Sequence, residues 1–398
     1  MRILQVIPYF IPAYAFGGPV RVAYEISKEL VNRGHEVVVF TSDVRNLNLR
    51  LDTDFREVID GITVYYFRNL TMLLVKKLKL LLTPQLILYA KEEIKKFDVI
   101  HLHEYRTFQN IIIRHYATKY GVPYVLQAHG SLPRIGSWRK LKLVYDVLFG
   151  YRLLKDAAKV VALNKMEVKQ YRSMGTPEEK IVVIPNGIDL SEYAKLPPKG
   201  AFRKKFNIPE DRKIILYLGR IHKIKGVDFL IKAYARVINE TNCKDAILII
   251  AGPDDGYLKE VQELTNRLGI SKHVLITGPL YGQDKLQAYV DSEFYVLPSR
   301  YETFPMTVLE AYACGVPVIV SNVGGLKDLV INGKTGLLVN VDDVDQLTSA
   351  IHFLLNNGEE TRRMGLRGKQ LVKSNFSIEK MIEKIEELYE KVIKQRRS

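Results

Sequence analysis

The sequence predicts an α/β protein of two domains, each built on a doubly wound parallel sheet. Short apolar segments typical of buried strands alternate with amphipathic segments of helical period along most of the chain. At 398 residues the chain is longer than one typical hydrophobic core. A polar segment at 190–213, with three prolines, separates an earlier series of strands from a later one. We therefore expect domains at 1–190 and 191–375, followed by a C-terminal helix at 376–398.

The first domain opens with a strand, a loop, a helix and a second strand. The loop at 8–19 is rich in glycine and proline, and Pro19 is expected to begin a helix that ends before Gly34. A strand–helix–strand unit of this length implies parallel strands. Further strands of this domain are expected at 36–41, 62–67, 99–103, 124–128, 160–163 and 181–185.

The second domain repeats the alternation. Its strands are expected at 214–218, 246–252, 274–278, 294–297 and 316–320, with a last one ending at Val339. Helices are expected at 227–237, from Pro305 to Gly315, at 345–356 and at 378–394.

Composition excludes several classes of protein. Two cysteines cannot form a disulfide framework, which favours a reducing, cytoplasmic location. Prolines interrupt the apolar amino terminus, unlike a secretory signal, and no apolar run is long enough to predict a membrane span.

The net charge is 59 − 44 = +15, and the residues up to Leu190 contribute 28 − 18 = +10. A basic first domain fits either an anionic partner, such as a membrane surface or a phosphorylated acceptor, or an ordinary charged surface without such a partner. Segments 71–83 and 138–145 mix basic with apolar residues, which fits either a helix in an anionic membrane interface or an ordinary helix covering a sheet. No nucleic-acid motif accompanies the charge, so nucleic acid is not expected as a partner.

Polar side chains follow several predicted strands, where open α/β sheets bind ligands. Arg220 and Lys225 lie in the loop after strand 214–218, and such a pair can hold a diphosphate. Glu302 lies in the loop after strand 294–297, and Glu310 lies inside the following helix. Carboxylates at this position can accept hydrogen bonds from sugar hydroxyls, while the helix terminus suits a phosphate.

Three histidines and one glutamate end two strands of the first domain. His101, His103 and Glu104 end one, and His129 follows the other. Their spacing fits no standard zinc pattern, so a ligand-binding edge is expected rather than a metal site. Two Asp-x-Asp strings, at 52–54 and 343–345, are interpreted as a polar loop and a helix cap respectively.

The string from Ser299 to Val320, with its Glu-x7-Glu pair and Glu-Ala-x-Ala-Cys-Gly-x-Pro-Val, closely resembles retaining glycosyltransferases of family 4. Gly219-Arg220-x4-Lys225-Gly226 and His129-Gly130 resemble other elements of that family, and the likeness spans nearly the whole chain. The resemblance implies the GT-B fold: two Rossmann-like domains facing across a cleft, the first binding acceptor and the second binding nucleotide sugar, with the final helix crossing back to the first.

The resemblance implies a retaining hexosyltransferase that moves a sugar from a UDP-, GDP- or ADP-linked donor to a hydroxyl of a glycan, lipid-linked or small acceptor in glycoconjugate synthesis. No cofactor or metal is expected. The residues implied in catalysis are His129, Glu302, Arg220 and Lys225. Those implied in donor binding are Gly17, Gly18, Arg220, Lys225, Gly278, Leu280, Glu302, Thr303, Phe304, Met306 and Glu310, with His103 and Glu104 on the acceptor side.

Two alternatives stay open. A sugar-nucleotide epimerase shares the GT-B architecture, and a membrane-associated scaffold could keep the fold without catalysis. Thr303 and Pro305 replace glycines that are frequent in the family, and Pro305 lacks an N–H that could contact phosphate.

Overall fold

The computed structural model describes residues 1–398 except 79, 137, 242 and 398. Lys79, part of the basic segment 71–83, therefore lies outside the described residues. The chain divides into two compact units, Met1–Gly187 with Ile378–Ser398, and Ile188–Ser377. The final helix thus belongs to the first unit, and the division after Gly187 lies three residues before the expected end of the first domain.

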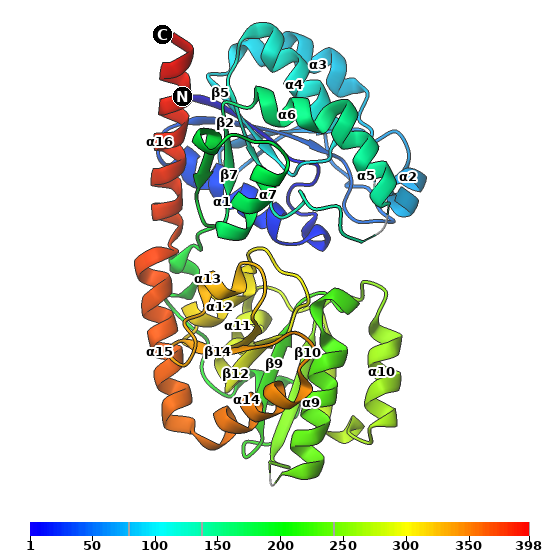
Figure 1. Cartoon of the computed structure of the whole chain (residues 1–398), viewed down its shortest axis with the longest axis vertical. Coiled ribbons are helices and arrows are strands. Elements are labelled where there is room, and N and C mark those ends of the chain that lie inside the picture. The colour runs from blue at the N-terminus through cyan, green and yellow to red at the C-terminus, as the bar shows by residue number, and fades with distance from the viewer. Residues whose placement is uncertain (79, 137, 242, 398) are drawn as a thin grey trace. The chain divides into compact units, whose positions relative to one another are not determined.

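The first unit contains a sheet in the order β3-β4-β2-β1-β5-β6-β7-β8. Figure 1 labels β2, β5 and β7 of this sheet. Only the β3–β4 pair is antiparallel among its described strand pairs. The strands are β1 (Arg2–Val6), β2 (Glu36–Ser42), β3 (Arg56–Ile59), β4 (Ile62–Phe67), β5 (Val99–His103), β6 (Tyr124–Gln127), β7 (Lys159–Ala162) and β8 (Ile181–Val183).

Helices pack on both faces of this sheet, as the hydrophobic alternation requires. A buried apolar cluster joins one face to α3, α4, α6 and α7, while α16 packs against α1 and β5. The helices are α1 (Gly18–Asn32), α2 (Met72–Leu78), α3 (Gln85–Glu93), α4 (Phe108–Tyr120), α5 (Arg139–Tyr145), a π-helical turn (Asp146–Gly150), α6 (Tyr151–Asp156), α7 (Lys165–Ser173) and α16 (Ile378–Arg397).

The second unit contains a parallel sheet in the order β11-β10-β9-β12-β13-β14. Its strands are β9 (Lys213–Leu218), β10 (Ala246–Ala251), β11 (Val274–Gly278), β12 (Phe294–Leu297), β13 (Val318–Ser321) and β14 (Gly336–Val339). Its helices are α8 (Ala201–Lys205), α9 (Val227–Glu240), α10 (Leu258–Arg267), α11 (Gly282–Asp291), α12 (Met306–Ala313), α13 (Leu326–Leu329), α14 (Val344–Asn356) and α15 (Gly358–Asn375).

The strand order places polar loops together. β9 and β12 are central neighbours in the second sheet, so the loops that follow them meet at its carboxyl edge. In the first unit β5 lies between β1 and β6, which aligns Gln5 with His101 and His103 with Gln127. Asp343 accepts a hydrogen bond from the Gln346 N–H at the start of α14, which explains the second Asp-x-Asp string as a helix cap.

Candidate functional site

The loop after β9 brings Lys225 to Glu302. Gly226 has φ 71°, and a Cβ added there would lie 2.0 Å from the Pro298 carbonyl oxygen. Glycine therefore lets this loop run directly against the end of β12. Lys225 Nζ lies 2.5 Å from Glu302 Oε2, and the two side chains are 17% and 11% exposed. The sequence-predicted cation and carboxylate thus form one half-buried pair.

Arg300 fastens the two loops together. Its guanidinium donates to both carboxylate oxygens of Asp228 at 2.8 Å and to the Lys223 carbonyl at 2.6 Å. Its backbone N–H donates to the Ile224 carbonyl at 2.8 Å. Hydrogen bonds to Asp228 and Asp342 raise the pKa of Arg300, which fixes its charge. Sequence reasoning missed Arg300, although an arginine two residues before Glu302 was a signal.

Arg220 has a different partner. Its Nη1 lies 2.6 Å from Asp255 Oδ2, and its side chain is 44% exposed. Its carbonyl accepts a hydrogen bond from the Tyr217 hydroxyl at 2.8 Å, which anchors the backbone while the guanidinium stays near solvent. Because an exposed ion pair is weak, an arriving anion can replace Asp255 at small cost.

Glu310 is buried on α12 and already paired. Its Oε1 lies 2.7 Å from Lys285 Nζ, and its Oε2 accepts a hydrogen bond from the Tyr289 hydroxyl at 3.2 Å. Both partners come from α11, which positions the carboxylate by packing and charge together. Lys285 was not predicted, because a single lysine in an amphipathic helix carries no recognisable signal.

The other predicted donor residues line the same edge of the second unit. Pro305 caps α12 and the helix begins at Met306, so the proline precedes the first helical residue instead of occupying it. Gly278 ends β11 with φ 75°, a conformation that favours glycine. The side chains buried here are Leu280, Thr303, Phe304 and Met306.

In the first unit the histidines form one hydrogen-bonded group. His103 Nδ1 lies 2.8 Å from His129 Nε2, and His103 Nε2 lies 2.7 Å from Gln5 Oε1. Burial lowers the pKa of His129 to about 3 and the pKa of His103 well below its usual value, so both rings are neutral near pH 7. Among the described residues, no three His, Cys, Asp or Glu side chains are grouped as metal ligands.

Glu104 and His129 both have left-handed backbones, with φ 66° and 50°. Such strain in non-glycine residues persists where the surrounding structure holds it, often at functional sites. Burial raises the pKa of Glu104 to about 7. Glu167, which was not predicted, accepts hydrogen bonds from the Gly130 N–H at 2.6 Å and the Leu163 N–H at 2.7 Å, and so holds the loop after β6 in place.

Each of the two units resembles a known family of proteins. The family description "Glycosyltransferase Family 4" matches residues 16–192, and "Glycosyl transferases group 1" matches residues 198–371. The two matches occupy the two units in turn and together span most of the chain. The chain belongs to glycosyltransferase family 4.

Relatives of this family-4 glycosyltransferase align along most of its length. N-acetyl-alpha-D-glucosaminyl L-malate synthase of Bacillus anthracis is 27% identical, covering 95% of each chain. UDP-Gal:alpha-D-GlcNAc-diphosphoundecaprenol alpha-1,3-galactosyltransferase of Escherichia coli is 27% identical, covering 81% of each chain. Anabaena HepE, solved with UDP and glucose, has a TM-score of 0.79 and 19% identity, covering 98% of this chain and 100% of its own. The GT-B fold and the glycosyltransferase class are therefore confirmed, in preference to the epimerase and the scaffold.

The remaining predicted residues of the glycosyltransferase lie at the start of α1. Gly17 precedes the helix with φ 92°, and Gly18 is its first residue, one before the expected Pro19. A Cβ added at Gly17 would meet no atom within 4 Å. The backbone conformation, rather than crowding by the protein, is what favours glycine at this position.

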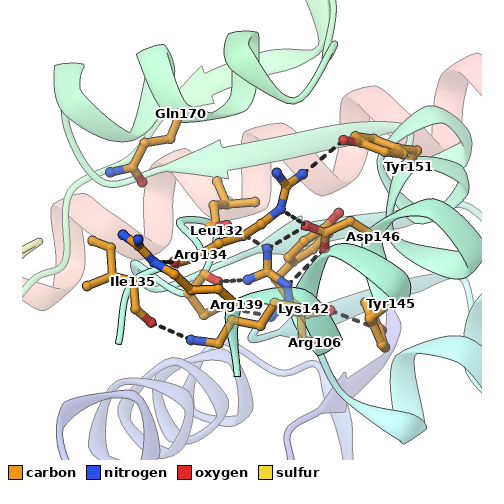
Figure 2. A network of polar contacts seen from close by, with 12 residues as sticks. Arg106, Leu132, Arg134, Ile135, Arg139, Lys142, Tyr145, Asp146, Tyr151 and Gln170 are labelled. Carbon is orange, nitrogen blue, oxygen red and sulfur yellow. Dashed lines mark hydrogen bonds and ion pairs between the residues drawn. The ribbon is translucent and has the colours of Figure 1, made fainter. Parts of the chain in front are cut away.

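A second polar group lies beyond the loop after β6 (Figure 2). Asp146 is fully buried, and its carboxylate lies 2.8 Å from Arg106 Nη2 and 2.7 Å from Arg134 Nε. Arg106 also donates to the Ser131 and Leu132 carbonyls at 2.5 and 2.8 Å. This pairing ties the segment from Ser131 to the π-helical turn that follows α5 and was not anticipated from the sequence.

Proposed function

We propose that this glycosyltransferase moves a hexosyl group from a nucleoside-diphosphate donor to an acceptor hydroxyl, with retention of anomeric configuration. The main support for this proposal is the ion pair between Lys225 Nζ and Glu302 Oε2, which lie 2.5 Å apart at the carboxyl edge of the second sheet. A cation and a hydroxyl-binding carboxylate side by side suit a substrate with a diphosphate next to a sugar. The presence of UDP and glucose in the HepE structure supports this donor class.

In the second unit we assign the nucleotide. Arg220 and Lys225 would neutralise the departing diphosphate, helped by the N–H groups near Phe304 and Met306 at the start of α12. Glu310 would hold the ribose hydroxyls, and Glu302 the donor sugar. Main chain near Gly278 and Leu280 would contact the base, and Thr303 would line the phosphate side.

In the first unit we assign the acceptor and the rest of the sugar. Gly17 and Gly18 allow close approach of backbone to ligand. His129 would line the donor sugar, while His103 and Glu104 would form the acceptor rim. No residue is assigned as a covalent nucleophile. The departing phosphate oxygen would accept the proton of the attacking hydroxyl on the same face of the sugar, which yields retention.

We propose that catalysis needs no divalent metal, because fixed cations can stabilise the leaving diphosphate. Full activity after exhaustive chelation is the expected result. Activity lost on chelation and restored by a divalent ion would overturn this part of the proposal.

We also propose a cytoplasmic enzyme in peripheral contact with an anionic membrane through its basic first unit, acting on a glycan, lipid-linked or small acceptor. No helix in the described part of the chain is long and apolar enough to span a bilayer. The name of the E. coli relative gives a diphosphoundecaprenol-linked sugar, which supports testing lipid-linked acceptors first.

A nucleotide screen tests the donor proposal directly. UDP, GDP and ADP would each be added to the enzyme while its unfolding temperature is followed. A ligand at 100 times its dissociation constant stabilises by about 2.7 kcal/mol, so the correct base gives a clear shift. The matching sugar nucleotide should not isomerise when it is incubated with the enzyme without acceptor. In a separate reaction with acceptor, NMR of the product should show the anomeric configuration of the donor. Failure of all three nucleotides to bind would refute the proposal.

A further inference from the structure

The helical run from Arg139 to Asp156 presents an unusual surface. Five apolar side chains along it and just before it are each 51 to 59% exposed: Trp138, Leu141, Val144, Val147 and Leu148. Contiguous exposed apolar surface of this kind marks an interaction site in a folded protein. The exposed cations of the run are Arg139, Lys140, Arg152 and Lys155.

The polar anchor explains why the apolar side faces outward. Asp146 is held inside by Arg106 and Arg134, and the Tyr145 hydroxyl donates to the Thr107 carbonyl at 3.0 Å (Figure 2). A Cβ added at Gly150 would lie 2.2 Å from the Tyr105 hydroxyl oxygen, so the run also approaches the unit closely there. These contacts fix the rotation of the run with Tyr145 and Asp146 inward, which leaves the five apolar side chains in solvent.

Charge decides what covers this surface. From Trp138 to Asp156 the acidic residues are Asp146, which is buried between two arginines, and Asp156, which is half-buried and paired with Arg114. Exposed apolar side chains beside exposed cations match an anionic bilayer. The apolar side chains enter the membrane interface, and the cations contact the anionic headgroups. Trp138, with φ 63°, is a bulky residue in a strained left-handed conformation at the edge of this surface, and aromatic rings of its kind favour the interface.

We propose that the surface formed by Trp138, Leu141, Val144, Val147 and Leu148, with its flanking cations, is the membrane-docking face of the first unit. This inference rests on the proposed peripheral contact and sharpens it. It selects the second of the two basic segments found in the sequence, because the described part of the first one buries Val75 of α2 with Val44 and Leu81. The bound partner is an anionic phospholipid bilayer, contacted without a spanning helix.

The chain has one tryptophan, so its fluorescence reports on this face alone. Vesicles of phosphatidylcholine with roughly one third phosphatidylglycerol should shift Trp138 emission to the blue, and added salt should reverse the shift. Pure phosphatidylcholine should do so weakly. Leu141→Ser with Val147→Ser should reduce partitioning into anionic vesicles by at least ~10-fold. Leu88→Ser, at a 74% exposed site on α3, is the matched control and should bind as the parent does.

Nucleotide binding measured on the same samples separates this inference from the donor proposal. Unchanged emission with anionic vesicles, in a protein that still binds its nucleotide, overturns the docking face alone. A parent that is dimeric without lipid and becomes monomeric with the double substitution also overturns it, since the face would then join two copies of the chain.

A different observation concerns α16. The Tyr389 hydroxyl lies 2.7 Å from His101 Nδ1 and accepts from Gln5 Nε2 at 3.2 Å. Gln5 Oε1 in turn lies 2.7 Å from His103 Nε2, which is 2.8 Å on its other side from His129. A continuous chain of hydrogen bonds therefore connects the C-terminal helix with the histidine assigned to the sugar.

Each link of this chain has one direction. An amide oxygen only accepts, so His103 carries its hydrogen on Nε2. A neutral His103 then has a lone pair on Nδ1, and His129 must donate from its own Nε2. His129 Nδ1 is left as an acceptor, the polarity required to receive a hydrogen bond from a sugar hydroxyl. We infer that Tyr389 is a positioning residue that sets the tautomer of His129 through Gln5 and His103.

Tyr389→Phe tests this, because it keeps the ring and removes the hydroxyl. With ¹⁵N-labelled histidine, the parent should show His129 as the Nε2–H tautomer, and the variant should show a mixture. Turnover should fall about 5- to 10-fold, as for a lost hydrogen bond, while nucleotide affinity stays unchanged. Tyr124→Phe removes another buried hydroxyl, bonded to the Leu153 carbonyl at 2.6 Å, and should leave the tautomer alone. An Nδ1–H tautomer in the parent, or identical spectra for parent and Tyr389→Phe, would refute the inference.

Discussion

The carboxyl edges of the two sheets are built on opposite electrostatic principles. In the second unit, Lys225–Glu302 and Lys285–Glu310 bring full charges together at 2.5 and 2.7 Å. In the first unit, burial keeps His103 and His129 neutral, and only hydrogen-bond direction distinguishes their nitrogens. A paired cation can exchange its partner for an incoming anion, whereas a neutral ring can only orient a hydroxyl. The edge proposed to bind the charged leaving group thus carries charged side chains. The other edge carries neutral side chains whose hydrogen bonds have a fixed direction.

Removing the cation gives the largest expected effect. Lys225→Ala should lower kcat/KM by roughly 10²- to 10³-fold, because the leaving diphosphate loses a fixed positive charge. Lys223→Ala is the matched control, since its side chain is exposed while its carbonyl, which receives Arg300, is retained. Steady-state kinetics of both variants measure the difference. If the turnover of Lys225→Ala stays within about three-fold of the control, the charge of Lys225 does not stabilise the leaving diphosphate.

The second carboxylate should act on binding rather than on chemistry. Glu310→Gln should weaken nucleotide binding by about 10- to 100-fold, the value of a charged hydrogen bond to a ribose hydroxyl. Calorimetry with a nucleoside diphosphate and its 2′-deoxy form sharpens the test. In the parent the deoxy form should bind more weakly than the full nucleotide, whereas in Glu310→Gln the two should bind with nearly equal affinity. Glu263→Gln, an exposed change on α10, serves as control. An undiminished deoxy penalty in Glu310→Gln would assign the ribose to another group.

In the first unit, the half-buried acid Glu104 should make stability depend on pH. The pKa of Glu104 is raised to about 7 in the folded chain from 4.5, so the folded form keeps its proton where the unfolded form loses it. The contribution of Glu104 to stability therefore falls as pH rises from about 4.5 to 7. The free energy of unfolding of Glu104→Gln should rise relative to that of the parent across this pH range, by on the order of 2 kcal/mol. Above about pH 7 the difference between the two proteins should stay constant. Urea unfolding at several pH values, with exposed Glu387→Gln as control, would show it; a difference independent of pH would contradict the prediction.

The smallest expected effect is on activity near neutrality. With its pKa lowered to about 3, His129 stays neutral, so kcat/KM should show no step from this group between pH 5.5 and 8. Stability carries the opposite sign to Glu104: the unfolded chain binds a proton at His129 below about 6.5 that the folded chain excludes, so acid destabilises. A step in the pH profile that disappears in His129→Gln would show a charged ring and end the contrast between the two edges.

Much of the architecture could be read from the sequence. Short, largely apolar segments predicted the strands at 99–103, 274–278 and 294–297 with the bounds that the structure has. The family-4 resemblance, carried by the string around Glu302 and Glu310, led to the class and the fold. β3 was not predicted, because its residues Arg56–Ile59 alternate in exposure at the edge of a sheet and lack a continuous apolar run. A local sequence pattern therefore predicts a strand only where the strand is buried.

The sequence by itself determined which residue types end the central strands, because side-chain chemistry and spacing are local properties. Tertiary structure alone decided their partners: Lys225 meets Glu302 across 77 positions, and Gln5 meets Tyr389 across 384. It also decided that Asp146 turns inward and the apolar side of its helix outward, against the usual order. The direction of a buried hydrogen bond and the rotation of a helix depend on groups brought together by packing, and no nearby residue in the chain specifies them.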